Sequence, residues 1–173
     1  MTLAHTVVAS PVGPLTLVAR DGVLCGLFMN EQRHRPDELV FGHADRGPFA
    51  DVEDQLEAYW AGDRTEFDVA LDMDGTEFQR AVWAGLRDIP YGTTMSYGEL
   101  ARRVGRPKAC RAVGLANGRN PIGIIVPCHR VIGSSGALTG YGGGLDRKRW
   151  LLEHERARTA TSPLTTLSCS PPW

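Results

Sequence analysis

Long apolar runs are missing from this 173-residue chain: no stretch of about 18 consecutive apolar residues occurs, so we expect no membrane-spanning helix. The first residues, Met1 to His5, lack the basic stretch and apolar core of an export signal, which predicts a cytoplasmic protein. Cysteine is also scarce, with four residues and no CxxC pair. The sequence therefore predicts neither a dithiol redox motif nor a disulfide framework.

Basic residues are scarce in the first part of the chain and acidic residues in the second. Residues 1–75 hold 5 Lys and Arg against 14 Asp and Glu, a net charge of −9, whereas residues 76–173 hold 14 against 6, a net charge of +8. The overall charge of −1 conceals this asymmetry. It indicates that only the second part approaches a polyanion, although a solvated basic face explains the charge equally well.

The first part is expected to form a small α+β unit. Turn signals at Pro11–Pro14 and Asp21-Gly22 separate runs of β-forming residues, which predict strands at 6–10, 15–20 and 23–29. Apolar residues recur at helical spacing from Val52 to Trp60 and predict an amphipathic helix that ends near Gly62. No pattern here indicates chemistry, so the expected role is structural.

Three other segments carry weaker signals. Residues 30–48 are polar, with Pro and Gly, and are expected to form a loop. The alternation of Phe67, Val69 and Leu71 predicts one more short strand. Residues 157–173 are rich in Ser, Thr and Pro and are expected to be disordered.

The second part begins with signals for helices. Thr76 with Gln79, and Ser96 with Glu99, match capping boxes, each marking the start of a helix. The turn 105–107 breaks the second helix, and a third is expected over 108–117. Two short helices joined by a tight turn form a candidate DNA-binding helix-turn-helix; a packed helical hairpin, which is the commoner arrangement, is the alternative.

These signals together predict the α+β class. A small domain with an antiparallel sheet and a helix, residues 1–74, is followed by a mainly helical domain with a helix-turn-helix, residues 75–156. The boundary falls near Asp72–Gly75, where the charge balance changes sign.

The segment with the strongest chemical signal is Pro127-Cys128-His129-Arg130, which follows a short apolar run, 123–126, expected to be buried. A thiol attacks as its thiolate but is mostly protonated at neutral pH. His129 could take the proton directly or through a water, and Arg130 favours the anion, although an ion-pair role is preferred for Arg130. Cys25 and Cys110 are expected to be small buried hydrophobes, and Cys169 to have no role.

The order of motifs around Cys128 resembles the O6-alkylguanine-DNA alkyltransferases. Asn120-Pro121, the apolar run, the Pro-Cys-His-Arg tetrapeptide, Gly140–Gly144 and Trp150–Glu155 follow one another as in that family. The likeness extends from Gly75 to about Glu155, and more loosely to residues 10–15. Family members transfer an alkyl group from the O6 of guanine to one of their own cysteines.

The resemblance implies catalytic roles for five residues. Cys128 corresponds to the alkyl acceptor, His129 to the base that acts through a water, and Glu155 to the carboxylate that orients the histidine. Asn120 matches an asparagine that hydrogen-bonds near the thiol. Tyr97 matches the tyrosine that helps to rotate the nucleotide and protonates the leaving guanine.

The resemblance also implies contacts with the base and the DNA. Arg111 matches an arginine that fills the gap in the base stack, on a helix placed in the minor groove. Tyr141 matches a pocket wall, and the amide of Gly142 a donor to O6, where many relatives carry serine. Carbonyls of Cys128 and Val131 would bind the exocyclic amine, and Ser134 is matched to a phosphate contact or to closure of the pocket.

The expected function is direct repair of O6-alkylguanine in double-stranded DNA, by irreversible transfer to Cys128 and without a cofactor. Each molecule would act once and as a monomer; clustering on DNA, O4-alkylthymine and the range of alkyl groups stay open. Some members hold zinc in the N-terminal part, but here Cys25 stands alone among the scattered His5, His34 and His43, so we expect no metal.

Three other functions are alternatives to this one. A non-catalytic module that binds alkylated DNA would replace the acceptor cysteine, commonly with tryptophan, yet Cys128 is present. A DNA-binding regulator would carry a further cysteine-rich N-terminal domain. A cysteine hydrolase would need an oxyanion hole and multiple turnover, and no motif supports either.

Overall fold

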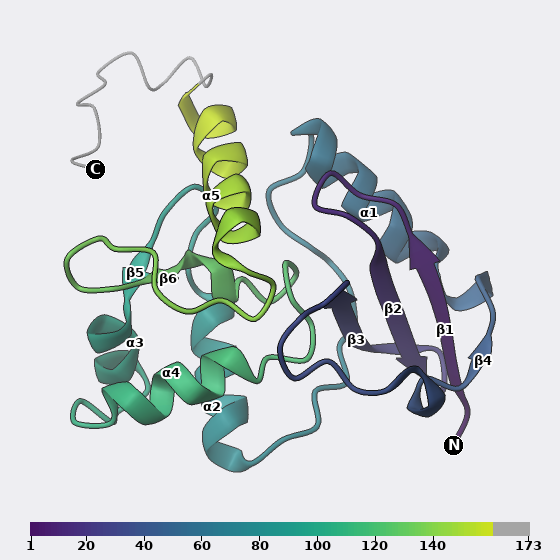
Figure 1. The fold of residues 1–173 in the computed structure, drawn as a ribbon, viewed down its shortest axis with the longest axis horizontal. Helices are drawn as coiled ribbons and strands as arrows, with labels where there is room; N and C mark the ends of the chain where they lie inside the picture. The colour runs from purple at the N-terminus through teal and green to yellow at the C-terminus, as the bar shows by residue number, and fades with distance from the viewer. Residues whose placement is uncertain (161–173) are drawn as a thin grey trace.

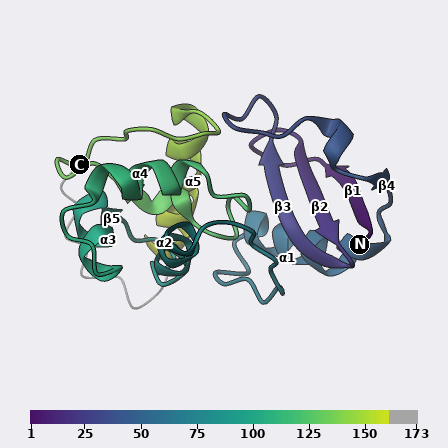
Figure 2. The ribbon, with the colours of Figure 1, turned by 90° about the horizontal axis from the view of Figure 1, so that it is seen from below.

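The computed structural model describes residues 1–160, and it has two parts that pack side by side (Figures 1 and 2). A four-stranded sheet with one helix forms the N-terminal part, and short helices form the C-terminal part, as the α+β prediction requires. One hydrophobic core runs through both, from Leu17 in the sheet to Trp83 and Leu151 in the helices. The two parts are therefore joined by one continuous packed core.

The sheet has the strand order β3-β2-β1-β4. Strands β1 (Leu3–Val8), β2 (Leu15–Arg20) and β3 (Val23–Met29) are antiparallel neighbours, close to the predicted runs. The connection between β2 and β3 is tight because Asp21 and Gly22 both adopt positive φ, at 48° and 83°. Such a turn matches the twist of the strands that it joins.

The polar segment 30–48 contains more structure than the expected loop. It holds the 3-10 helices η1 (Glu38–Val40) and η2 (Gly47–Phe49) and the strand β4 (His43–Ala44). Strand β4 pairs in parallel with β1, which is a tertiary contact without a local sequence signal. Helix α1 (Ala50–Ala61) follows and ends at Gly62, whose φ of 82° closes the helix as predicted.

The predicted strand at 67–71 is wrong. Only Leu71 makes a bridge, an isolated one with Leu24 of β3. The side chain of Gln55 forms hydrogen bonds with both polar groups of the Asp68 backbone. It accepts from the N–H at 2.8 Å and donates to the carbonyl at 2.9 Å. These bonds replace the ladder that the alternating pattern suggested.

Both predicted capping boxes are confirmed. Thr76 caps α2 (Glu77–Arg87) reciprocally with Gln79, and Ser96 caps α3 (Tyr97–Arg103) reciprocally with Glu99. Helix α4 (Cys110–Gly118) starts two residues later than expected. Helices α3 and α4 form the predicted helix-turn-helix.

A short parallel pair of strands joins this motif to the cysteine segment. Strand β5 (Met95–Ser96) immediately precedes α3, and β6 (Val131–Ile132) immediately follows the 3-10 helix η3 (Cys128–Arg130). Met95 pairs with Val131 and Ser96 with Ile132. The pairing places the first residue of α3 beside the segment that carries Cys128.

Helix α5 (Leu145–Ala160) extends beyond the predicted domain end at 156. Residues 157–160 are therefore helical, which corrects the start of the predicted disordered tail; its remainder, with Cys169, lies outside the described residues. Cys110 is exposed, so it is not the buried hydrophobe that the sequence predicts, whereas Cys25 is half-buried and packs against the cluster of Val18, Phe28 and Phe41. Among the described residues no helix is both long and apolar enough to span a membrane.

The cap of α3 yields a test of stability. Replacement Ser96→Ala removes the acceptor for the Glu99 N–H and is expected to lower the free energy of unfolding by about 1 kcal/mol, measured by urea denaturation. Ser135→Ala, at an exposed serine in the segment after β6, serves as the control and should change it by less than about 0.5 kcal/mol. Equal effects would contradict the capping role.

Candidate active site

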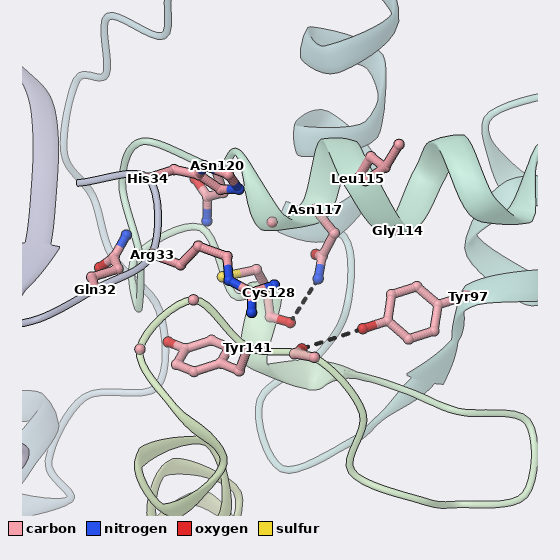
Figure 3. A pocket seen from close by; sticks show the side chains of 15 residues that line it. Gln32, Arg33, His34, Tyr97, Gly114, Leu115, Asn117, Asn120, Cys128 and Tyr141 are labelled. Carbon is pink, nitrogen blue, oxygen red and sulfur yellow. Dashed lines mark hydrogen bonds between the residues drawn. The ribbon is translucent and has the colours of Figure 1, made fainter. Parts of the chain in front are cut away.

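Cys128 lies in a pocket between the two parts of the chain. The cavity measures about 130 Å³. Its walls come from the loop after β3, from α4, and from the segment 140–143 (Figure 3). The labelled side chains there are Gln32, Arg33, His34, Tyr97, Leu115, Asn117, Asn120, Cys128 and Tyr141. A nucleophile inside a cavity of mixed polarity is the arrangement expected of a site for a small group or a base.

The Cys128 side chain is 8% exposed, in the first residue of η3. Burial, the largest influence, raises the pKa of its thiol. Hydrogen bonding from Asn120, the charge of Lys148 and hydrogen bonding from Tyr141 act in the opposite direction without reversing the shift. The resting thiol therefore keeps its proton at neutral pH, so a nearby proton acceptor is needed to form the thiolate.

His129 is fully buried beside Cys128, and its two ring nitrogens have different surroundings. Nε2 lies 2.8 Å from Oε2 of Glu155. Nδ1 is buried and has no hydrogen-bond partner within residues 1–160. If Nε2–H donates to the carboxylate, Nδ1 carries the free lone pair and can accept a proton.

Glu155, on α5, is the most heavily bonded carboxylate of the site. Arg130 donates from Nε to Oε1 at 2.8 Å and from Nη2 to Oε2 at 2.9 Å, which is the ion pair expected for this arginine. Burial alone raises the pKa of Glu155, but His129 and Arg130 together hold that pKa well below its usual range. The carboxylate stays ionised, so it only accepts hydrogen bonds.

Two asparagines hold the backbone around Cys128. Asn120 donates to the Val126 carbonyl at 2.8 Å, and its Oδ1 accepts from the N–H of Ile122 at 3.0 Å. Asn117, on α4, donates to the carbonyl of Cys128 at 3.5 Å. These bonds join the end of the helix-turn-helix to the candidate nucleophile.

The segment 133–144 is attached to the pocket by Tyr97 and Lys148. The Tyr97 hydroxyl donates to the Thr139 carbonyl at 3.0 Å. Lys148 Nζ donates to the carbonyls of Val131 at 2.6 Å, Thr139 at 3.1 Å and Gly140 at 3.4 Å. Burial lowers the pKa of Lys148 to about 8, with Cys128 opposing the shift. The lysine thus fixes the pocket rim from inside.

The N-terminal part closes the other side of this rim. The N–H of Arg33 donates to the Gly142 carbonyl at 2.8 Å, and Arg147 Nη1 donates to the Asn30 carbonyl at 2.6 Å. Tyr141 and Gly142 line the pocket, as the resemblance implied for them. The loop after β3 is therefore part of the pocket wall.

The structure brings together seven of the ten residues singled out from the sequence: Tyr97, Asn120, Cys128, Tyr141 and Gly142 line the pocket, and His129, next to Cys128 in η3, bonds Glu155. The other three are not among the lining residues. Arg111 is exposed on α4, Ser134 is exposed beyond β6, and the Val131 carbonyl is occupied by Lys148.

Sequence reasoning missed several residues of the site. Lys148 stands between two arginines in the sequence, a pattern typical of an exposed basic face, and yet it is fully buried. Asn117 lies on the buried side of α4, which helical spacing could have indicated. The loop 32–34 had no local signal, because its place depends on how the two parts pack.

Residues 1–160 contain no cluster of three or more His, Cys, Asp or Glu side chains arranged to hold a metal ion. The polar groups around Cys128 bond to one another instead.

The buried carboxylate predicts an acid-sensitive stability. Because Arg130 loses its partner, Glu155→Gln is expected to lower the free energy of unfolding at neutral pH by about 3–5 kcal/mol. The folded-state pKa of Glu155 lies below the unfolded value of about 4.3, so the contribution is complete above that value and is lost as the pH falls. The wild-type advantage should thus shrink in acid.

Urea denaturation of the wild type and of Glu155→Gln measures the difference in their free energies of unfolding, once at neutral pH and once near pH 3.5. Glu153→Gln, at an exposed position of the same helix, is the matched control and should leave both unchanged. A wild-type advantage that is the same at both pH values would contradict the assignment.

The two parts of the chain each match a domain of one family. Residues 3–73 match the ribonuclease-like domain of 6-O-methylguanine DNA methyltransferase, and residues 77–157 match its DNA binding domain. The methylated-DNA–protein-cysteine methyltransferase of Mycobacterium tuberculosis H37Rv is 58% identical over 154 residues, covering 89% of this chain and 93% of the relative. That of Methanosarcina acetivorans is 50% identical over 154 residues, covering 87% and 97%.

Solved structures agree with these matches. Mycobacterium tuberculosis OGT, solved in complex with DNA, has a TM-score of 0.86 and 57% identity, covering 90% of this chain and 94% of that one. The O6-methylguanine-DNA methyltransferase of Pyrococcus kodakaraensis, at 23% identity and a TM-score of 0.52, shares the fold. The chain therefore belongs to the 6-O-methylguanine DNA methyltransferase family.

Proposed function

We propose that this protein repairs DNA by transferring the alkyl group of O6-alkylguanine to Cys128. The observation that carries the proposal is the buried thiol in a pocket, adjacent in sequence to a histidine whose Nε2 is bonded to an ionised carboxylate. Family membership and the likeness to OGT bound to DNA support the same reaction. The alternative of a non-catalytic binding module is not favoured, because Cys128 is present.

The proposed transfer is a displacement at the carbon attached to O6. His129, oriented by Glu155, accepts the thiol proton through a water at its unpartnered Nδ1. The sulfur then bonds the alkyl carbon as the carbon–oxygen bond breaks, and the Tyr97 hydroxyl gives a proton to the leaving guanine. Asn120 near the thiol favours the anion. No cofactor is required.

The product explains a single turnover. A thioether has no carbonyl for water to attack, so the cysteine is not readily regenerated. Each molecule therefore repairs one base, and the alkylated protein accumulates in proportion to the damage removed.

The DNA face is proposed to be the helix-turn-helix. Arg111 on α4 is exposed, and Gly114 and Leu115 of the same helix line the pocket, so the helix that meets DNA also borders the site. In this proposal α4 enters the minor groove, and Arg111 fills the gap left when the base is turned out, a step that costs a few kcal/mol. The Val131 carbonyl, which already accepts from Lys148, would bind the exocyclic amine of the base through its second lone pair. Ser134 would contact the DNA backbone.

The organisation of the chain follows from this arrangement. The DNA-binding and active-site domain begins at residue 75 and runs to the end of α5 at Ala160. Residues 1–74 form the smaller domain, whose loop 32–34 completes the pocket wall. In this proposal the protein acts as a monomer in the cytoplasm and binds double-stranded DNA. One chain is sufficient because it carries every side chain that the proposed transfer uses.

The direct test uses duplex DNA with radiolabelled O6-methylguanine. Peptide mapping should place one label per protein molecule on Cys128, and excess substrate should give no further turnover. Cys128→Ser should abolish transfer and keep DNA binding, whereas Cys110→Ser, at an exposed cysteine, should transfer normally. Label on another residue, or repair without labelled protein, would refute the proposal.

Arg111→Ala tests the base-extrusion step. The variant is expected to bind damaged duplex more weakly and to react roughly tenfold or more slowly with it, because the vacated stack is no longer filled. Its reaction with free O6-benzylguanine should be unchanged, since that base needs no extrusion. Arg87→Ala, at an exposed arginine of α2, is the control. An equal loss with the free base would contradict the role.

A further inference from the structure

We infer that Tyr59, on helix α1 of the N-terminal part, is a positioning residue for alkyl transfer, because its hydroxyl fixes the carboxylate that orients His129. The hydroxyl donates to Oε2 of Glu155 at 2.6 Å, and both residues are fully buried. His129 Nε2 bonds the same oxygen at 2.8 Å. The inference rests on the proposed function, since it concerns how the Cys128 thiol loses its proton.

The position of the Tyr59 hydroxyl is set by packing between α1 and α5. The ring contacts Trp60 at 4.9 Å, His154 at 5.3 Å and Phe67 at 5.4 Å between centroids. His154 Nε2 also lies 2.9 Å from the carbonyl of Tyr59. Adjacent residues of α5, His154 and Glu155, thus hold the backbone and the hydroxyl of one tyrosine.

The hydroxyl can act only as a donor to this carboxylate. Burial, the charge of Glu155 and the hydrogen bond to it raise the pKa of Tyr59 well above its usual range, so the proton stays on the phenol. Oε2 then accepts from Tyr59 and Arg130 as well as from the histidine. An oxygen held in this way favours the His129 tautomer with hydrogen on Nε2 and the lone pair on Nδ1.

Every element packed around this site contributes an ionisable group. Glu155 faces Tyr59 on α1, Tyr91 on the segment after α2, and His129 and Arg130 on η3. The thiol faces a second set, Lys148 on α5, Tyr141 and Tyr97. On α5 itself, His154 packs on Tyr59, and Arg158 acts on Tyr91. His129, Arg130 and Tyr59 bond the carboxylate, and of these three Tyr59 alone belongs to the N-terminal part.

Tyr91 provides a matched control. Its ring packs against that of Tyr59 at 6.1 Å and lies 5.6 Å from the Arg130 guanidinium carbon, but its buried hydroxyl has no hydrogen-bond partner within residues 1–160. Tyr91→Phe therefore removes a phenol hydroxyl from the same cluster without touching Glu155. Tyr59→Phe keeps the ring contacts and removes only the bond in question.

The test compares the pH dependence of two reactions of Cys128 in the wild type, Tyr59→Phe and Tyr91→Phe. One is alkyl transfer from O6-methylguanine in duplex DNA, and the other is alkylation by iodoacetamide without DNA, read by mass spectrometry of the Cys128 peptide. With the histidine less firmly oriented, Tyr59→Phe should keep the thiol protonated to higher pH. The midpoint of both profiles should rise by about 1 pH unit, a roughly tenfold slower reaction at pH 7.

At alkaline pH the Tyr59→Phe rates should converge with the wild type, because the thiolate then forms without the base. Tyr91→Phe should follow the wild-type profile throughout, and thermal unfolding of both variants reports on folding. An unshifted midpoint, a uniform loss at every pH, or the same shift in Tyr91→Phe would overturn the inference. Wild-type protein that reacts with iodoacetamide at Cys128 but never receives the alkyl group from DNA would instead refute the proposed function.

Discussion

The candidate site depends on the hydrogen bonds and the ion pair of one buried carboxylate, that of Glu155. It receives hydrogen bonds from Tyr59 on α1 and from His129 and Arg130 on η3, while Arg130 also donates to the Ile89 carbonyl at 2.7 Å. A buried charge is tolerated only when it is paired and its hydrogen bonds are satisfied. Three elements distant in sequence must therefore meet at one side chain, and one of them, η3, begins with Cys128.

The same burial that makes this carboxylate costly also shapes the reactivity of the thiol. Enclosure in the pocket raises the pKa of Cys128, so the free thiol is protected until a proton acceptor acts on it. Lys148 and Tyr97 hold the rim segment through backbone carbonyls, and the N–H of Arg33 holds it from the N-terminal part. The pocket is thus fixed by main-chain contacts that do not depend on the bases it would receive.

The asymmetry of charge acquires a structural meaning in this arrangement. The basic second part carries the helix-turn-helix, where phosphates would be met, and the acidic first part supplies a sheet, a pocket wall and Tyr59. The sequence predicts only a structural role for the first part, because no motif in it indicates chemistry. The first part contributes the Tyr59 hydroxyl and the loop 32–34 to the site, and no local sequence pattern indicates either of them.

The sequence by itself determined the helix starts at Thr76 and Ser96, the hairpin turn at Asp21-Gly22 and the motif around Cys128. These features depend on residues within a few positions of one another, so local preferences and motif spacing are sufficient. Only the tertiary structure decided that Lys148 is buried, that residues 67–71 are not a strand, and that Tyr59 reaches Glu155 across 96 positions. Those outcomes depend on which distant groups satisfy a buried polar atom, and a linear pattern does not contain that information.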